Sequence, residues 1–189
     1  AEGMQRPAVV MATGLGKTTC FAEVARRRTA AGRKPTLVLA HRIELIDQAA
    51  ERLRLAGLTV AIETGEQRAS MASLFGETDA VIATVQTLRA KRLEKWAPDA
   101  FDTVVCDEAH HAAAAGYRAI LDRFTGAMHL GVTATPDRGD SIAIGHVYPH
   151  LAYSYGIREG VTDGFLVPIS QIAIDTPSLD MSSVRTTKQ

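Results

Sequence analysis

The sequence contains only two cysteines, Cys20 and Cys106, among its 189 residues. Two cysteines are too few for a disulfide framework and show no metal-ligand spacing, which suits a reducing cytosol. The apolar runs are all shorter than the roughly 18 residues that a membrane-spanning helix needs, and the first residues, AEGMQRP, lack the apolar core of a secretion signal. We therefore expect a soluble, cytoplasmic chain without a membrane partner.

The chain also lacks net charge, because 21 basic side chains balance 21 acidic ones. Bulk charge therefore favours neither a nucleic acid nor a membrane as the partner, and any electrostatic attraction has to be local. Internal repeats and low-complexity segments are absent as well. A length of 189 residues with 46% hydrophobic content suits one well-buried core, so we expect a single domain.

What the sequence does have is a series of short apolar runs with helical segments between them. The runs predict strands over residues 7–12, 36–40, 59–63, 80–84, 102–108, 129–135 and 167–175. Continuous apolar runs are typical of strands that are buried on both faces of a parallel sheet. Helical spacing over 18–32 and 42–57 ends near Gly32 and Gly57, where a left-handed cap fits. The predicted fold class is α/β, a mostly parallel sheet with helices on both faces, over residues 1–175, with a polar tail or linker over 176–189.

The stretch ATGLGKTT, residues 12–19, joins the first predicted strand to the first predicted helix. Gly14 and Gly16 would let backbone N–H groups surround an anion, and the helix N-terminus adds positive charge. Lys17 would reach the β- and γ-phosphates of ATP, and the Thr18 hydroxyl would hold Mg²⁺. The alternative is an ordinary helix entry with a solvated lysine, and Met11 stands where the usual pattern begins with glycine. The predicted nucleotide-binding residues are Thr13, Gly14, Leu15, Gly16, Lys17, Thr18 and Thr19.

Two adjacent acids, Asp107 and Glu108, end the predicted strand over 102–108. Ligands of parallel sheets bind at the carboxyl ends of the strands, where this pair lies. Neighbouring strand residues point to opposite faces, so we expect different roles for the two acids. Asp107 would support Mg²⁺, and Glu108 would orient and deprotonate the attacking water, which makes both acids and Lys17 the predicted catalytic residues. The alternative is an exposed acidic strand end that begins a helix.

With MATGLGKT, DEAH and GVTATP in this order, the chain resembles the first RecA-like motor domain of superfamily 2 helicases and translocases, from residue 7 to about 174. The resemblance implies a RecA-like P-loop fold and nucleic-acid-stimulated ATP hydrolysis with Mg²⁺. VLAHRIEL resembles motif Ia and IATVQTL resembles motif Ib, which contact the nucleic-acid backbone. Thr133 to Thr135 resemble motif III, which couples nucleotide state to strand grip. YGIREGVTDGFLVPI resembles the segment that closes this domain in restriction-enzyme motor subunits.

His41 and Arg42 follow the predicted strand over 36–40, and Thr84 and Gln86 come at the end of the strand over 80–84. Both groups could present donors to phosphates on one rim of the sheet, so these four are the predicted nucleic-acid residues. The alternative for each is a helix cap, for Thr84 especially. Two arginine-rich patches, at 25–28 and 89–95, are interpreted as solvated helix faces and are left out of the site.

The histidines are not interpreted as metal ligands. His110 and His111 are helix neighbours, which do not share a face, and we interpret His110 as a polar link towards Thr133 or a second domain. His146 and His150 have the i, i+4 spacing of a metal-binding helix, but Pro149 breaks that helix, so they are expected in a loop or in packing.

The resemblance also bears on the substrate and on what a complete motor needs. RNA-remodelling relatives commonly carry Ser-Ala-Thr in motif III, whereas Thr-Ala-Thr beside DEAHH resembles the group of type I and type III restriction motors and excision-repair translocases. Duplex DNA is therefore favoured, and RNA is the alternative. The family completes its ATP site with an arginine finger from a second RecA-like domain and reads adenine through an upstream glutamine, and Gln5 is too close to Lys17 to match. We expect a fragment that binds nucleotide and hydrolyses it slowly, with the second RecA-like domain of the parent chain as its partner and nuclease or accessory domains as possible further ones.

Two other functions stay open. In the first, ATP changes the affinity of the chain for a nucleic-acid partner and turnover is incidental. The second is an unrelated P-loop ATPase, such as a transporter, which is disfavoured because no signature loop after a longer helical insertion is visible in the sequence.

Overall fold

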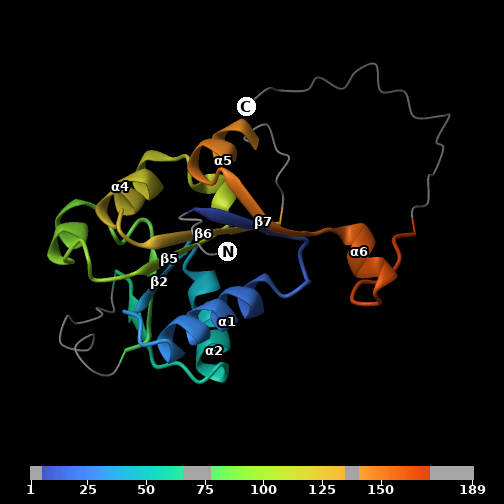
Figure 1. Ribbon diagram of the computed structural model, residues 1–189, viewed down its shortest axis with the longest axis horizontal. Helices are drawn as coiled ribbons and strands as arrows, with labels where there is room; N and C mark the ends of the chain where they lie inside the picture. The colour runs from blue at the N-terminus through green and yellow to red at the C-terminus, as the bar shows by residue number, and fades with distance from the viewer. Residues whose placement is uncertain (1–5, 66–77, 135–140, 171–189) are drawn as a thin grey trace, which may run out of the picture.

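The computed structural model describes residues 6–65, 78–134 and 141–170 (Figure 1). Its centre is a seven-stranded sheet in the order β3-β4-β2-β5-β6-β1-β7, in which all neighbouring strands are parallel. The strands are β1 (Pro7–Met11), β2 (Thr36–Ala40), β3 (Val60–Glu63), β4 (Ala80–Thr84), β5 (Thr103–Asp107), β6 (Met128–Thr133) and β7 (His150–Tyr155). The predicted α/β fold class is confirmed.

The continuous apolar runs form the middle of the sheet. Every residue of β2 and β4 is buried, as are the first four of β5. Strands covered on both faces need apolar side chains at every position, so an unbroken run rather than an alternating one specifies them. All the strands predicted between residues 7 and 135 form, and their ends differ from the predicted ones by at most two residues.

The seventh strand is a correction. It is β7, over His150–Tyr155, and not the run at 167–175: residues 167–170 have no regular secondary structure, and 171–175 lie outside the described residues. β7 pairs with β1 at the edge of the sheet, where most of its side chains are exposed. An edge strand exposed in this way carries no continuous apolar run, so the pattern that found the central strands could not find it.

Helices cover both faces of the sheet, as Figure 1 shows. On one side lie α1 (Lys17–Ala30) and α2 (Glu44–Leu55), and on the other α4 (Ala115–Arg123) and α5 (Ser141–Val147). A short helix, α6 (Ile157–Thr162), follows β7, and two 3-10 turns are η1 (Ala90–Lys95) and η2 (Ala109–His111). None of the described helices is long and apolar enough to cross a membrane.

The two layers give two apolar cores, one on each face. Phe21, Val38 and Leu53 belong to the first, and Val104 and Phe124 belong to the second. The ends of α1 and α2 are followed by Gly32 (φ 69°) and Gly57 (φ 83°), which confirms the predicted left-handed caps. Because all the strands are parallel, their carboxyl ends meet at one edge, and the loops after β1, β2, β4 and β5 share that edge with the end of β6.

Candidate active site

The loop between β1 and α1 has a backbone that requires glycine. Gly14 (φ 87°) and Gly16 (φ 86°) are both left-handed, a conformation that costs other residues free energy. Gly16 occupies the N-cap of α1, whose first turn carries no side-chain cap and no acidic residue. The N–H groups at the start of α1 are therefore left for a ligand, and the helix dipole favours an anion there.

Lys17 lies back across this loop. Its Nζ donates a hydrogen bond to the Met11 carbonyl at 3.5 Å. Met11 is the last residue of β1 and is buried. Its φ angle is not positive, so its backbone conformation does not require glycine. The side chain at this position is therefore compatible with the loop, which accounts for the departure from the usual glycine pattern.

Both acids face the glycine loop. A cavity of about 430 Å³ is lined by Thr13, Gly14, Gly16, Lys17, Thr18, Thr19, Leu45, Gln48, Glu51, Arg52, Asp107 and Glu108. The expectation that strand alternation would send the two acids to opposite faces is wrong. β5 ends at Asp107, and Glu108 has a left-handed backbone (φ 54°, ψ 54°) that turns its side chain to the same cavity.

The electrostatics of the pair are those of crowded carboxylates. Burial raises the pKa of Asp107, and the charge of Glu108 raises it further, while the Glu108 N–H, donated to Asp107 Oδ1 at 3.1 Å, and the charge of Lys17 lower it. A bound cation would stabilise both acids in their charged form. The cavity thus combines donors for phosphate oxygens with carboxylates for a metal or a water.

A row of side chains extends from these acids along the carboxyl edge of the sheet. Glu108 Oε2 lies 3.3 Å from His110 Nδ1, which is 3.1 Å from the hydroxyl of Thr133. The His110 ring also contacts the ring of His111, with centroids 4.0 Å apart and planes at 48°. The expectation that these two histidines lie on separate faces is therefore wrong, because η2 is a single tight turn.

The row continues into the loops after β2 and β4. The His41 and His111 rings stack with centroids 4.0 Å apart and an angle of 21° between their planes. Gln86 Nε2 donates to the His41 carbonyl at 3.4 Å. Side-chain contacts thereby join the segments after β2 and β5 to the end of β6, and the Gln86 side chain joins the segment after β4 to the backbone of His41. These four strands are adjacent in the sheet.

Comparison with known proteins decides the family. Residues 2–138 match the family described as type III restriction enzyme, res subunit. The chain belongs to this family. With its phosphate loop, acid pair and β6 in the expected order, it forms the first RecA-like domain of the superfamily 2 type.

Three relatives are similar to most or all of this chain, which covers only part of their own lengths. IRC3 of Saccharomyces cerevisiae, provisionally named an ATP-dependent helicase, is 32% identical over 98% of this chain and 28% of its own length. The type I restriction enzyme EcoAI endonuclease subunit of Escherichia coli is 31% identical over 100% and 24%. The DNA 3'-5' translocase XPB2 of Sulfurisphaera tokodaii is 31% identical over 84% and 33%. The chain thus spans a third or less of these relatives.

A solved structure shares the fold of this chain. The Pyrococcus furiosus Hef helicase domain superposes with a TM-score of 0.66 at 24% identity, over 80% of this chain and 35% of that one. The likeness concerns the RecA-like fold.

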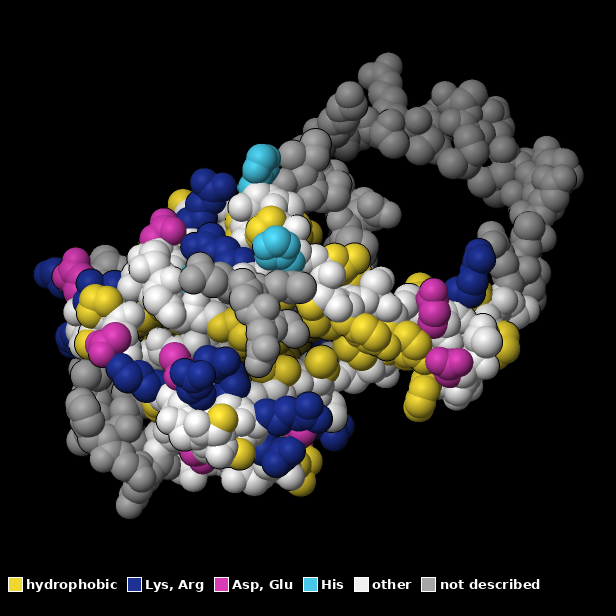
Figure 2. Space-filling model, in the orientation of Figure 1, with side chains coloured by type: hydrophobic (Ala, Val, Ile, Leu, Met, Phe, Trp, Pro, Cys, Tyr) yellow, Lys and Arg dark blue, Asp and Glu magenta, His cyan; other side chains and the backbone are white. Residues whose placement is uncertain are grey.

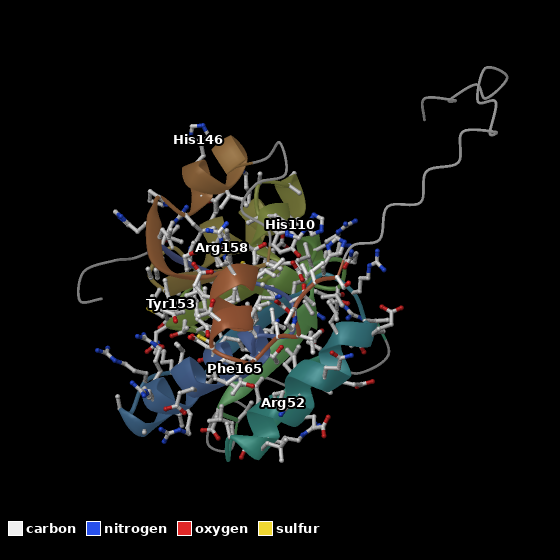
Figure 3. The ribbon with its side chains drawn as sticks, turned by 90° about the vertical axis from the view of Figure 1, so that its right-hand side faces the viewer. Arg52, His110, His146, Tyr153, Arg158 and Phe165 are labelled. Atoms are coloured by element: carbon white, nitrogen blue, oxygen red, sulfur yellow. The ribbon has the colours of Figure 1, made fainter. Side chains whose placement is uncertain are left out.

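Sequence reasoning missed the part of the res-family cavity that α2 contributes. Leu45, Gln48 and Arg52 lie one and two turns apart on α2, beside its buried face, and line the cavity. Figure 3 shows Arg52 on this helix. Polar residues that flank an apolar stripe were the available signal, but only the packing of α1 against α2 shows that they reach the phosphate loop.

The remaining predicted residues differ in their placement. Arg42 and Gln86 are exposed on the rim. Thr84 is buried, and its Oγ1 accepts a hydrogen bond from the Thr87 N–H at 3.2 Å. This is the hydrogen bond of a cap, the alternative role given above for Thr84, although it closes a turn here and not a helix. Thr135 lies outside the described residues. His146 lies in α5 and His150 begins β7, so no single helix carries both, but the expectation that they lie in a loop or in packing is wrong, because both are exposed residues of regular elements.

The two basic patches make internal ion pairs. Arg26 and Arg27 both donate to Glu23, and Arg92 lies 3.3 Å from Glu63. These contacts agree with the interpretation of the patches as helix faces rather than binding sites.

The segment after β7 packs on the phosphate loop. A Cβ added to Gly160 of α6 would lie 2.8 Å from a methyl carbon of Leu15 and 3.0 Å from one of Leu166. A second cavity, of about 560 Å³, lies between this segment and the end of β1. Figure 2 shows the apolar side chains that gather there in a band leading to α6, and Val167 is 83% exposed.

Proposed function

We propose that the chain binds ATP with Mg²⁺ and hydrolyses it as the first motor domain of a DNA helicase or translocase. The observation that carries the proposal is the convergence of the left-handed glycine loop, Lys17 and both acids on one cavity. Family membership supports it, and so do the relatives that are named as a helicase and as a DNA translocase.

The roles follow from the placement of the residues. The backbone N–H groups from Thr13 to Thr19 and the Lys17 ammonium would hold the β- and γ-phosphates. Glu108, at the cavity wall beside Lys17, would orient the attacking water and take its proton. His110 would sense the state of Glu108 and pass it to Thr133 and Thr135.

The donor set fits Mg²⁺. Thr18 and Asp107, a hydroxyl and a carboxylate, line the same cavity, and Mg²⁺ binds through one or two protein oxygens together with substrate phosphates and water. The described residues contain no group of three or more His, Cys, Asp or Glu side chains that could hold a metal without a substrate. When bound, Mg²⁺ neutralises charge on the phosphates.

The test uses the full-length protein with Glu108→Gln and Lys17→Ala. Glu108→Gln should keep ATP affinity within about threefold and lose about 100-fold or more in turnover, because the glutamine cannot accept a proton. Lys17→Ala should weaken ATP binding itself. Glu94→Gln, on the exposed side of η1, is the control. Full ATP affinity and full turnover in Lys17→Ala would contradict the phosphate-loop assignment.

The proposed substrate is duplex DNA, contacted by His41, Arg42 and Gln86 on the rim, with Thr84 shaping the turn that presents Gln86. Contacts of this kind go to phosphates and carry no base code. ATPase rates with duplex DNA, single-stranded DNA and RNA compare the alternatives directly. Stimulation by RNA alone would transfer the proposal to an RNA helicase.

The nucleotide-dependent switch is the second candidate. It is favoured by the row of contacts from Glu108 through His110 and His111 to His41 on the rim, which we call the coupling row. In that case ATP would change DNA affinity while DNA leaves the turnover rate unchanged. We also propose that residues 1–175 form the first domain and 176–189 a linker, and that a second RecA-like domain supplies an arginine finger. Nuclease or accessory domains are possible further parts of the protein, for which we propose a cytoplasmic location.

A further inference from the structure

In the coupling row, the loop after β2 and the turn after β5 meet through two stacked rings, those of His41 and His111. His41 follows β2, and His111 ends η2, directly after the acid pair. Their centroids are 4.0 Å apart and their planes 21° apart, which is a parallel contact rather than a grazing one.

Each ring is attached to a rigid support. On the β5 side, Ala109 and Ala112 flank the histidine pair and are fully buried, so η2 cannot shift without disturbing the core. On the β2 side, Ala40 is 1% exposed. Glu108 and His111 are therefore held in a fixed relation by this turn, so that a contact that places one of them also places the other.

The orientation of His41 depends on its ring face. Its Nδ1 is buried and has no hydrogen-bond partner. Burial lowers the pKa of His41, the charges of His111 and Arg42 lower it further, and the charge of Glu108 raises it. A neutral ring can stack on its neighbour without charge repulsion.

The stack also reaches the second rim loop, because Gln86 donates to the carbonyl of His41. Movement of His41 would then move the loops after β2 and β4 together. Both of these loops carry the residues proposed to contact DNA.

We infer that the His41–His111 stack is a positioning contact that couples DNA on the rim to the placement of Glu108 in the ATP cavity. The inference rests on the proposed function. DNA that orders the loop after β2 would order His41 and, through the stack, His111. Because His111 and Glu108 belong to the same turn, Glu108 would be ordered as well. Because such coupling is reciprocal, ATP has to change DNA affinity by the same factor as DNA changes ATP affinity.

The experiment compares a ring with a polar side chain at one position of the full-length protein. His111→Phe keeps the ring and removes the polar atoms, whereas His111→Gln keeps a polar group and removes the ring. The readouts are the stimulation ratio, which is turnover at saturating duplex DNA divided by turnover without DNA, and the change in DNA affinity on adding a non-hydrolysable ATP analogue. Thermal melting of each variant checks that it is folded.

We expect His111→Gln and His111→Ala to lose about 3- to 10-fold in the stimulation ratio, and about 3- to 10-fold in the change of DNA affinity that the ATP analogue causes. His111→Phe should recover the ratio to within about twofold of the wild type. The double variant His41→Ala with His111→Ala should be no worse than the worse single variant, because both remove the same contact.

Three results would overturn the inference. The first is a stimulation ratio that is recovered in His111→Gln but not in His111→Phe, and the second is a double variant whose loss in this ratio is the product of the two single losses. The third is a stimulation ratio that His111→Ala leaves unchanged. A wild type that hydrolyses ATP with no stimulation by DNA overturns the motor proposal as well, whereas a stimulated wild type with an unchanged His111→Ala overturns the stack alone.

Discussion

Asp107 and Glu108 are neighbours in the chain but are held in the cavity by different means. Asp107 is held there as the last residue of β5, and its burial raises its pKa. Glu108 is, among the described residues, the one non-glycine with a left-handed backbone, a conformation that costs free energy and persists where the surroundings enforce it. Both features store strain at the proposed reaction centre rather than in the core.

The raised pKa of Asp107 predicts the effect of Asp107→Asn on stability. A folded-state pKa above the ordinary 3.8 means that the folded protein binds this proton more tightly than the unfolded chain does. Stability is therefore lost as the pH rises from the ordinary value through the raised one, and the full penalty is present at pH 7. Asparagine removes the charge and can still accept the Glu108 N–H.

We therefore expect Asp107→Asn to raise the melting temperature of the nucleotide-free protein at pH 7 by about 2 °C or more, although it should abolish turnover. The gain should shrink as the pH is lowered through the raised pKa towards the ordinary value of 3.8, because the wild-type carboxyl then gains a proton. Asp122→Asn, an exposed position on α4, is the matched control. A lower melting temperature for Asp107→Asn at pH 7 would show that the carboxylate is stabilised, not strained.

At the scale of elements, α6 and the phosphate loop share one contact. Gly160 lies against Leu15 and Leu166 so closely that a methyl group would meet both side chains. We expect Gly160→Ala to lower the free energy of unfolding by about 1–2 kcal/mol, since the two leucines can shift only partly. It should also weaken ATP binding, because Leu15 belongs to the loop.

Chemical denaturation and ATP titration measure the two effects. Gly126→Ala is the control, as a methyl group there would meet no atom within 4 Å. Shortening Leu15 to alanine in the Gly160→Ala background should restore part of the ATP affinity. An affinity unchanged by Gly160→Ala would show that α6 does not support the loop.

The elements also show how far the sequence could predict the structure. The strands from β1 to β6 carry unbroken apolar runs, which their burial in the sheet requires except at the half-buried edge strand β3, so their composition specifies them. The loop from Gly14 to Lys17 follows from local backbone chemistry. β7 and the backbone of Glu108 could not be predicted in this way. An exposed edge strand carries no apolar run, and the turn at Glu108 is imposed by the surroundings of η2 rather than by its own residue type.

The same limit applies to the site. The approach of Gln48 and Arg52 to the phosphate loop depends on how α2 packs on α1, and the stack of His41 on His111 depends on the adjacency of β2 and β5. Both contacts join residues far apart in the sequence. The motifs predict that the site lies at the carboxyl ends of the strands. Which side chains meet there depends on the order of the strands in the sheet, which the motifs do not give.

For the whole molecule, a formal net charge of zero means that DNA affinity has to come from a few local contacts. Binding that releases few counterions depends weakly on salt. Arg42 is exposed on the rim at the start of the segment leading into α2, whereas Arg54 is exposed in the last turn of α2, at the opposite end of that helix. The two arginines therefore differ in position but not in charge.

We expect Arg42→Ala to weaken duplex DNA binding equally for unrelated sequences and to reduce the slope of log affinity against log salt by about one, as the loss of one phosphate contact requires. Arg54→Ala removes the same charge and should change neither quantity. Fluorescence anisotropy of the full-length protein over a range of salt concentrations measures both slopes. If the two variants lose affinity to the same extent, general charge and not the rim attracts the DNA, and the loops after β2 and β4 are not its binding surface.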